Sequence, residues 1–240
     1  MTLDSWRAVF LAIPLILVMA MGQMMVIICR HVDISIGSIL AFSAIVIGLL
    51  YIQFPGLSLW LSLIITAFVG LVMGLINGFI VTRFNVHSII VTLGTLSLYR
   101  GLVFIVSGGR QIDRNDIPEH VVSFSQTSFL FSIPAILIFS AIIVIITHLV
   151  MRHSVLGREI YATGSNPVAA HLKGINVTKV TLFCFGVCGM LAGVAGLFYA
   201  SRFGYVNPGV TGVGIEFIVI AGVIIGGTSI TGGSGSVLGT

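Results

Sequence analysis

The sequence has few charged residues: 11 lysines and arginines and 7 acids among 240 residues, or 8%. A soluble domain carries about 25% charged residues, because its surface must stay hydrated. Here 57% of the residues are hydrophobic instead. Several apolar runs have 18 or more residues, roughly the length that crosses a hydrocarbon core of about 30 Å. The composition therefore excludes an ordinary soluble domain and predicts an all-α, polytopic transmembrane helical bundle.

Cysteine is also scarce, and Cys29, Cys184 and Cys188 all lie inside apolar runs. Their spacing fits no disulfide framework or zinc motif, so we interpret them as small packing residues and predict no metal site. Motifs for a P-loop, a zinc protease or a serine hydrolase are missing, and no catalytic residue is predicted. A net charge of +4 spread over loops suits cytoplasmic anchoring and does not indicate nucleic-acid binding.

Seven apolar segments divide residues 1–240, which we interpret as one membrane-embedded domain. Pro14 and Pro134 are expected to kink or begin their helices, as membrane helices tolerate. The seventh segment is too short to cross untilted, which favours a half-helix or a re-entrant element. The expected segments are 8–29, 34–53, 57–82, 86–107, 129–151, 180–201 and 215–227.

Basic residues determine the expected orientation. The loop 152–179 has four lysines and arginines against one acid, so the positive-inside rule places it in the cytoplasm. The loop 107–128 has two arginines against three acids, as expected on the outer side. This arrangement leaves the amino terminus outside, which implies that a preceding span is missing.

Glycines recur at helical spacing in the stretches 70–78 and 186–196. Such small-residue faces let helix backbones approach closely where lipid gives no hydrophobic drive for association. We therefore predict a tight bundle. Asn77 lies within the first stretch, where an interhelical hydrogen bond is favoured over a ligand contact.

Glycine and serine lie beside apolar runs in two weakly similar segments, 35–40 and 229–238. Matched segments of this kind often mark the broken helices of an internal repeat in transporters. Arg100 is expected near an outer helix end, where it either pairs with acids of the outer loop or serves a gate. The candidates for a translocation path or gate are Ser35, Ser38, Asn77, Arg100, Glu216, Thr228, Ser229, Gly232 and Gly233.

Carboxylates deep in the membrane are not expected, since Asp33 and Glu216 are both predicted at span edges. Glu216 opens its segment, where the helix dipole favours a carboxylate. Intramembrane proton relays use carboxylates at depth, which argues against a proton-coupled transporter. The glycine-rich stretch 222–236 also lacks the repeated pore-loop context of a selectivity filter.

One short helix is marked clearly in the polar stretch 157–177. Asn166 is a strong N-cap, Pro167 suits the first helical position, and Gly174 suits the position after the C-cap. A helix of about seven residues is unstable alone in water, so it must dock.

An apolar stripe on this short helix is formed by Val168, Leu172 and Ile175. The stripe can pack against the bundle itself or against a second protein. The residue pattern alone leaves both possibilities open.

The stretch 157–177 fits G-R-x-x-Y-A-x-G-x-N-P-x-A-A-x-x-x-G-I-x-V. This pattern resembles the cytoplasmic signature of bacterial ATP-binding-cassette (ABC) sugar-importer permeases of the ribose type. The stretches 33–44, 91–101 and 214–240 also match that family, in the same order, so the resemblance covers nearly the whole chain. The stretches 99–112 and 157–166 are most similar to permeases that import autoinducer-2.

The resemblance implies a multi-pass permease subunit in the bacterial inner membrane that imports a monosaccharide or the sugar-like signal autoinducer-2. Its implied partners are a second permease chain, ABC ATPase subunits, a periplasmic or lipid-anchored binding protein, and lipid. The chain itself would hold no cofactor, because the ATPase subunits bind Mg-ATP. Family members continue past the glycine-rich stretch, so a fragment lacking terminal membrane helices is expected. The alternative is a stand-alone secondary transporter or channel for small polar solutes.

The family's coupling helix, which contacts the ATPase, maps to 166–174. Val168 and His171 stand where the family often has an acid and an arginine, so specific salt bridges to the ATPase are not expected. The coupling residues implied by the resemblance are Gly164, Asn166, Pro167, Val168, Ala169, Ala170, Leu172 and Gly174.

Overall fold

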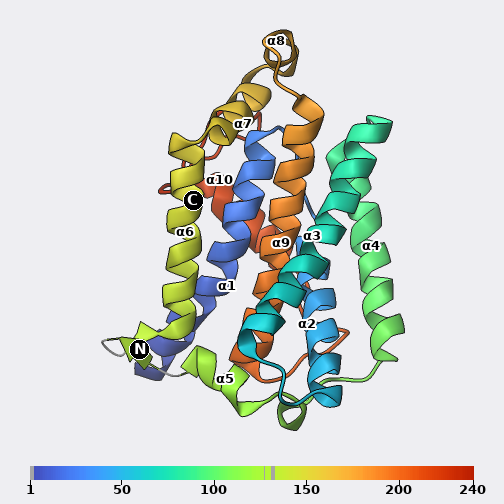
Figure 1. The fold of residues 1–240 in the computed structure, drawn as a ribbon, viewed down its shortest axis with the longest axis vertical. Helices are drawn as coiled ribbons and strands as arrows, with labels where there is room; N and C mark the ends of the chain where they lie inside the picture. The colour runs from blue at the N-terminus through green and yellow to red at the C-terminus, as the bar shows by residue number, and fades with distance from the viewer. Residues whose placement is uncertain (1–2, 127, 131–132) are drawn as a thin grey trace.

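A computed structural model describes residues 3–126, 128–130 and 133–240, with side chains described for 12–125 and 134–240. Long helices dominate it (Figure 1). They are α1 (Leu3–Ile28), α2 (Ile36–Gln53), α3 (Leu59–Phe84), α4 (Ser88–Ser107), α6 (Ala135–His153) and α9 (Val177–Phe203). The shorter elements are η1 (Arg114–Asp116), α5 (Glu119–Gln126), α7 (Val155–Ser165), α8 (Pro167–Leu172) and α10 (Ile215–Ile225), together with β1 (Ser128–Leu130) paired antiparallel to β2 (Ile133–Pro134).

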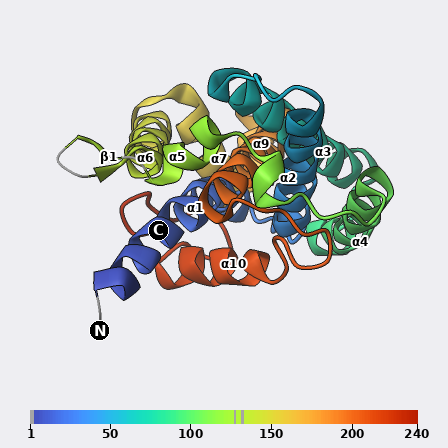
Figure 2. The same cartoon turned by 90° about the horizontal axis from the view of Figure 1, so that it is seen from below.

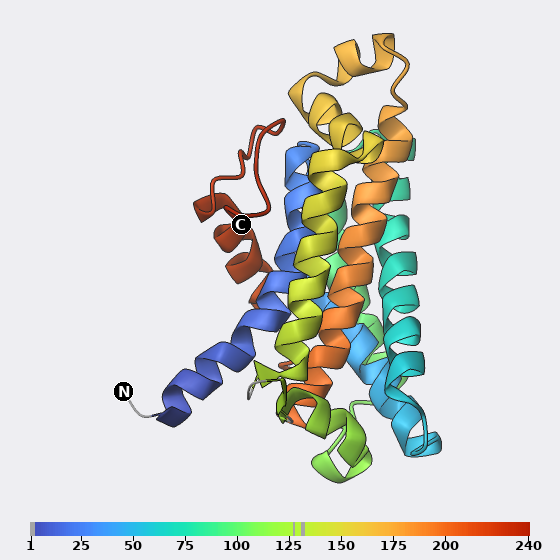
Figure 3. The same ribbon diagram turned by 60° about the vertical axis from the view of Figure 1, so that its left-hand side comes forward.

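Five helices, α2, α3, α4, α6 and α9, are long and apolar enough to cross a membrane. Ala12–Ile28 and Ile215–Ile225 are shorter apolar helices, so α10 has the reduced length predicted for it. The predicted polytopic helical bundle is confirmed. The largest boundary error is at 129–151, where the helix begins only at Ala135, directly after Pro134. Pro14 lies inside α1, which bends along its length (Figure 3).

Helix α9 occupies the centre of the bundle, between α1, α2 and α3 (Figures 1 and 2). The predicted glycine faces meet at its contact with α3. A Cβ atom added at Gly189 would lie 2.7 Å from the Cα of Gly74, and one at Gly70 would lie 2.9 Å from the Cα of Gly193. The two backbones are therefore in direct contact, which confirms the predicted tight packing.

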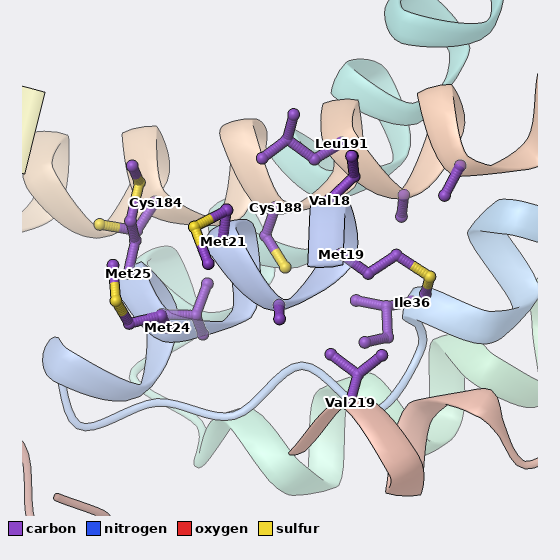
Figure 4. Packing of buried hydrophobic residues seen from close by; sticks show 14 of the residues in the cluster. Val18, Met19, Met21, Met24, Met25, Ile36, Cys184, Cys188, Leu191 and Val219 are labelled. Carbon is purple, nitrogen blue, oxygen red and sulfur yellow. The ribbon is translucent and has the colours of Figure 1, made fainter. Parts of the chain in front are cut away.

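Sulfur-containing side chains fill the interface of α1 with α9 (Figure 4). Met21, Met24, Cys184 and Cys188 are all buried there. All three cysteines are free, and the sulfurs of Cys29 and Cys184 lie 3.4 Å apart. They act as small apolar residues in the core.

The two ends of the bundle carry the two loops that differ in charge. Helices α7 and α8 lie at one end, and η1 and α5 lie at the other (Figure 1). At the latter end, Arg110 pairs with Asp116 at 3.4 Å and Arg114 pairs with Glu119 at 2.8 Å. This placement agrees with the opposite sides predicted from charge.

Candidate functional site

Helix α8 has the ends that its sequence predicts. The Asn166 side-chain oxygen accepts hydrogen bonds from the backbone N–H groups of Val168 and Ala169, both at 3.1 Å. Pro167 follows as the first helical residue. After the helix, Gly174 has φ +84°, a left-handed conformation that favours glycine.

The outer side of α8 is apolar and unusually exposed. The exposed fraction is 71% for Val168 and 82% for Leu172, whereas Ala170 is buried. Ile175 lies beyond the helix and packs against the core. The predicted three-residue stripe is therefore wrong in part: only Val168 and Leu172 are exposed. Helix α8 itself lies at one tip of the molecule (Figure 1).

The sequence interpretation missed a second helix in this region, α7. Its N-cap is Ser154, whose hydroxyl accepts from the N–H of Gly157 at 3.0 Å. Gly157, Ile160 and Gly164 are buried at spacings of three and four residues. This serine cap and buried spacing were the signals available in the sequence. One short helix was predicted in the cytoplasmic loop, and the structure has two, α7 and α8.

Gly164, near the end of α7, touches two segments that are distant in sequence. An added Cβ would overlap the Ile28 carbonyl oxygen and lie 2.7 Å from the backbone nitrogen of Gly233. That nitrogen donates to Ile28 O at 2.9 Å. The Arg30 guanidinium donates to the carbonyls of Gly164 and Ser165, at 2.5 and 2.6 Å. We call this group of contacts the α7 junction, because it joins α7 to the end of α1 and to the glycine-rich segment.

The glycine-rich segment after α10 is non-helical. Gly232 and Gly233 have φ values of +81° and +75°. The Tyr161 hydroxyl on α7 donates to the Gly235 carbonyl at 2.9 Å, and burial raises the pKa of Tyr161, so the phenol remains a donor. Arg30 and Tyr161 were not among the sequence-based candidates, because their partners lie more than 70 residues away.

The remaining candidates in this segment contact other residues. Thr228 is buried, with its hydroxyl 3.3 Å from that of Thr240. The hydroxyl of Ser229 lies 2.8 Å from that of Thr231. These two residues therefore lie outside the α7 junction.

A buried polar cluster joins the loop before α2 to α3 and α4. Asp33 accepts from the N–H and hydroxyl of Ser35, at 2.8 and 2.7 Å. The amide of Asn77 donates to the Ser35 hydroxyl at 2.8 Å and accepts from the Tyr99 hydroxyl at 3.1 Å. Asn77 is thus the predicted interhelical hydrogen bonder. Asp33 lies between the end of α1 and the start of α2, beside two helix ends as predicted, and it is fully buried there.

The start of α2 also corrects the expected internal repeat. Ser38 donates to the Ser35 carbonyl at 2.6 Å, and the helix runs unbroken from Ile36. The segments 35–40 and 229–238 therefore differ in conformation, the first being almost wholly helical and the second non-helical. They are not a matched pair of broken helices.

Arg100 and Glu216 lie in a third place, around the turn before α10. The Arg100 guanidinium donates to the Thr211 carbonyl at 2.5 Å, instead of pairing with acids of the outer loop. Two of those three acids, Asp116 and Glu119, pair with the loop's own arginines. Glu216 is buried against Gly37, and one of its oxygens has no partner among the described residues. The nine path candidates thus do not form one compact site: four lie in the glycine-rich segment, three in or beside the cluster around Asn77, and Arg100 and Glu216 near the turn before α10, with Glu216 against the start of α2.

The chain matches one protein family over almost its full length. The model of the family described as "Branched-chain amino acid transport system / permease component" matches residues 7–240. No solved structure matches the chain significantly.

Curated relatives carry the name "Autoinducer 2 import system permease protein LsrC". The Yersinia enterocolitica relative is 35% identical over 237 residues, which cover 99% of this chain and 64% of the relative. A Yersinia pseudotuberculosis relative is 33% identical over 238 residues, covering 99% of this chain and 66% of the relative. The chain therefore spans just under two thirds of the length of these relatives. On the family match, this chain belongs to the branched-chain amino acid transport system permease component family, which confirms its resemblance to ABC importer permeases.

Proposed function

We propose that this chain is a transmembrane permease subunit of a bacterial ABC importer in the inner membrane. Its cargo is a monosaccharide or autoinducer-2, the compound that the relatives are named for importing. A second permease chain completes the path, a binding protein delivers cargo at the α5 end, and separate ATPase subunits bind Mg-ATP.

The observation that carries this proposal is the exposed apolar surface of α8. The helix has six residues, so it depends on its N-cap and on contacts for stability. Leu172 and Val168 are nevertheless turned away from the bundle. An ATPase that covers these two side chains would remove apolar surface from water, which favours association.

Movement of α8 has a direct route into the bundle. Helix α7 ends at Ser165 and α8 begins at Pro167, so only Asn166 separates them. The α7 junction then connects Gly164 to Ile28 and Gly233 through backbone and guanidinium contacts. We propose that ATPase motion reaches α1 and the glycine-rich segment through these contacts, and so shifts the gate between two states.

The buried cluster around Asn77 and the Arg100–Glu216 group are the proposed path or gate elements. Ser35 and Asn77 hold the start of α2 against α3. Arg100 holds the turn before α10 against α4. A path between these helices can open only if these polar groups change hydrogen-bond partners. The hydroxyl groups of the cargo can serve as the new partners.

The test is the substitution Leu172→Asp. It places a charge in the proposed ATPase contact, where burying an unpaired charge costs several kcal/mol. A cost of this size lowers the affinity for the ATPase by roughly two or more orders of magnitude. The variant should insert normally, lose its cognate ATPase during co-purification and fail to transport. The control is Val210→Asp, which places the same charge at a 60% exposed valine in the segment before α10 and should retain the ATPase.

Two outcomes would contradict the proposal. Retention of the ATPase and normal uptake by Leu172→Asp would show that α8 is not the coupling element. Solute flux through the purified chain in proteoliposomes, without any ATPase, would instead favour a stand-alone transporter or channel.

A further inference from the structure

A cavity of about 400 Å³ lies between the end of α6, the start of α7 and the chain after α10. Its volume is within the range of small-molecule sites, about 300–1,000 Å³. None of the path candidates or coupling residues lines it. The lining residues are His148, Met151, Arg152, Arg158, Tyr161, Ser236, Val237 and Leu238.

The cavity is basic and has no compensating acid in its wall. Arg152 and Arg158 come from different helices, and no carboxylate is among the lining residues. Neither arginine takes part in an ion pair within the described residues. Arg158 reaches only the His153 carbonyl, at 3.5 Å. Two guanidinium groups with free donors are therefore available to an anionic ligand.

The position of the cavity limits what this anion can be. His148 and Arg152 lie in the last two turns of α6, at the basic end of a helix long enough to cross the membrane. One turn before His148, on the same face, Ile145 has an exposed fraction of 57%. The site therefore has cations at its polar end and an apolar helix surface leading away from them into the membrane.

We propose that this cavity binds the headgroup phosphate of an anionic phospholipid from the cytoplasmic leaflet. Arginine matches phosphate oxygens with paired N–H donors. Basic pockets between membrane helices on the cytoplasmic side suit anionic headgroups, and an acyl chain can lie along the apolar face of α6 at the same time. A soluble phosphate would use the arginines but not Ile145.

A lipid in this cavity would also fasten α7 to α6. Arg158 and Tyr161 lie on α7, the helix that carries Gly164 at the α7 junction. The lipid phosphate would bridge Arg152 of α6 and Arg158 of α7. Binding would therefore stabilise the position of α7, whether or not an ATPase is present.

The experiment measures lipid binding to the purified chain in nanodiscs. Phosphatidylglycerol is titrated into phosphatidylcholine, and the bound lipid is counted by native mass spectrometry alongside the thermal midpoint. The wild type should retain phosphatidylglycerol saturably and gain thermal stability. Arg152→Gln with Arg158→Gln should weaken binding about thirty-fold, as expected for two interfacial cations.

The matched control removes two cations from the same end of the bundle but outside the cavity. Arg83→Gln with Lys179→Gln should bind phosphatidylglycerol as the wild type does, since both residues are exposed and neither lines the cavity. Arg152→Lys with Arg158→Lys should keep most of the binding. This conservative variant separates loss of charge from misfolding.

Two results would overturn the proposal. Equal loss of binding in the control and the cavity variant would show a general charge effect instead of a site. Equal stabilisation by glycerol 3-phosphate in pure phosphatidylcholine would show that the cavity takes a soluble phosphate and that no lipid is required. Neither readout involves transport, so failure here leaves the proposed importer function untouched.

Discussion

Gly164→Ala tests the α7 junction with the smallest possible change. The added methyl group would overlap the Ile28 carbonyl and sit 2.7 Å from the Gly233 nitrogen, where ordinary contacts begin at 3.4 Å. Both neighbours are backbone atoms, so no side-chain rotation can relieve the overlap. Helix α7 must therefore move away from α1 and from the glycine-rich segment.

The cost of this movement can be estimated from the contacts that it disturbs. Overpacking costs about 1–3 kcal/mol. The bond from Gly233 N–H to Ile28 contributes about 1 kcal/mol, and the charged bonds of Arg30 about 1.5–3 kcal/mol. Partial loss of these gives a destabilisation of about 3 kcal/mol. For a chain of this length the thermal midpoint should fall by about 6–12 °C.

The assay is thermal unfolding in nanodiscs, with Gly94→Ala as the matched control. Gly94 lies in α4, is exposed, and has no atom within 4 Å of an added Cβ. Its midpoint should stay at or slightly above that of the wild type, because alanine favours helix more than glycine does. If Gly164→Ala has the same thermal midpoint as the wild type and Gly94→Ala, the close approach at the α7 junction does not exist.

The orientation of the chain, the cluster around Asn77 and the role of His171 can each be tested by substitution. Single cysteines can be placed at Ser165 and Asn115, which are exposed at opposite ends of the bundle, after the native cysteines are replaced by alanine. In intact cells an impermeant thiol reagent should label the cysteine at 115 and not the one at 165. Equal labelling of the two would contradict the orientation. Asn77→Ala should destabilise the protein by about 1–3 kcal/mol, because the buried hydroxyls of Ser35 and Tyr99 lose their hydrogen-bond partner. The control Ser97→Ala, at an exposed position, should not change stability. Equal melting curves for the two variants would show that the cluster does not contribute to stability. His171→Ala should retain the ATPase, because its imidazole forms no hydrogen bond among the described residues, and loss of the ATPase would give His171 a direct role in docking.

Local and compositional features were predictable from the sequence. The low charge and repeated apolar runs indicated the membrane-spanning bundle, because lipid requires them over a whole helix length. Asn166 and Gly174 marked the ends of α8, since caps act on backbone groups only a few residues away. The glycines at 70–78 and 186–196 indicated close helix packing without stating which helices would meet.

Only the tertiary structure decided which distant groups became partners. Arg30 binds the end of α7, more than 130 residues later in the sequence. The backbone atoms of Ile28 and Gly233 leave no room for a side chain at Gly164. Asp33 is adjacent to a helix end in sequence, yet the packing of α3 and α4 buries it. Such contacts depend on how whole helices pack, and a one-dimensional pattern carries no information on that geometry. The exposure of Leu172 was likewise decided by packing, because the same stripe was compatible with docking inward or outward.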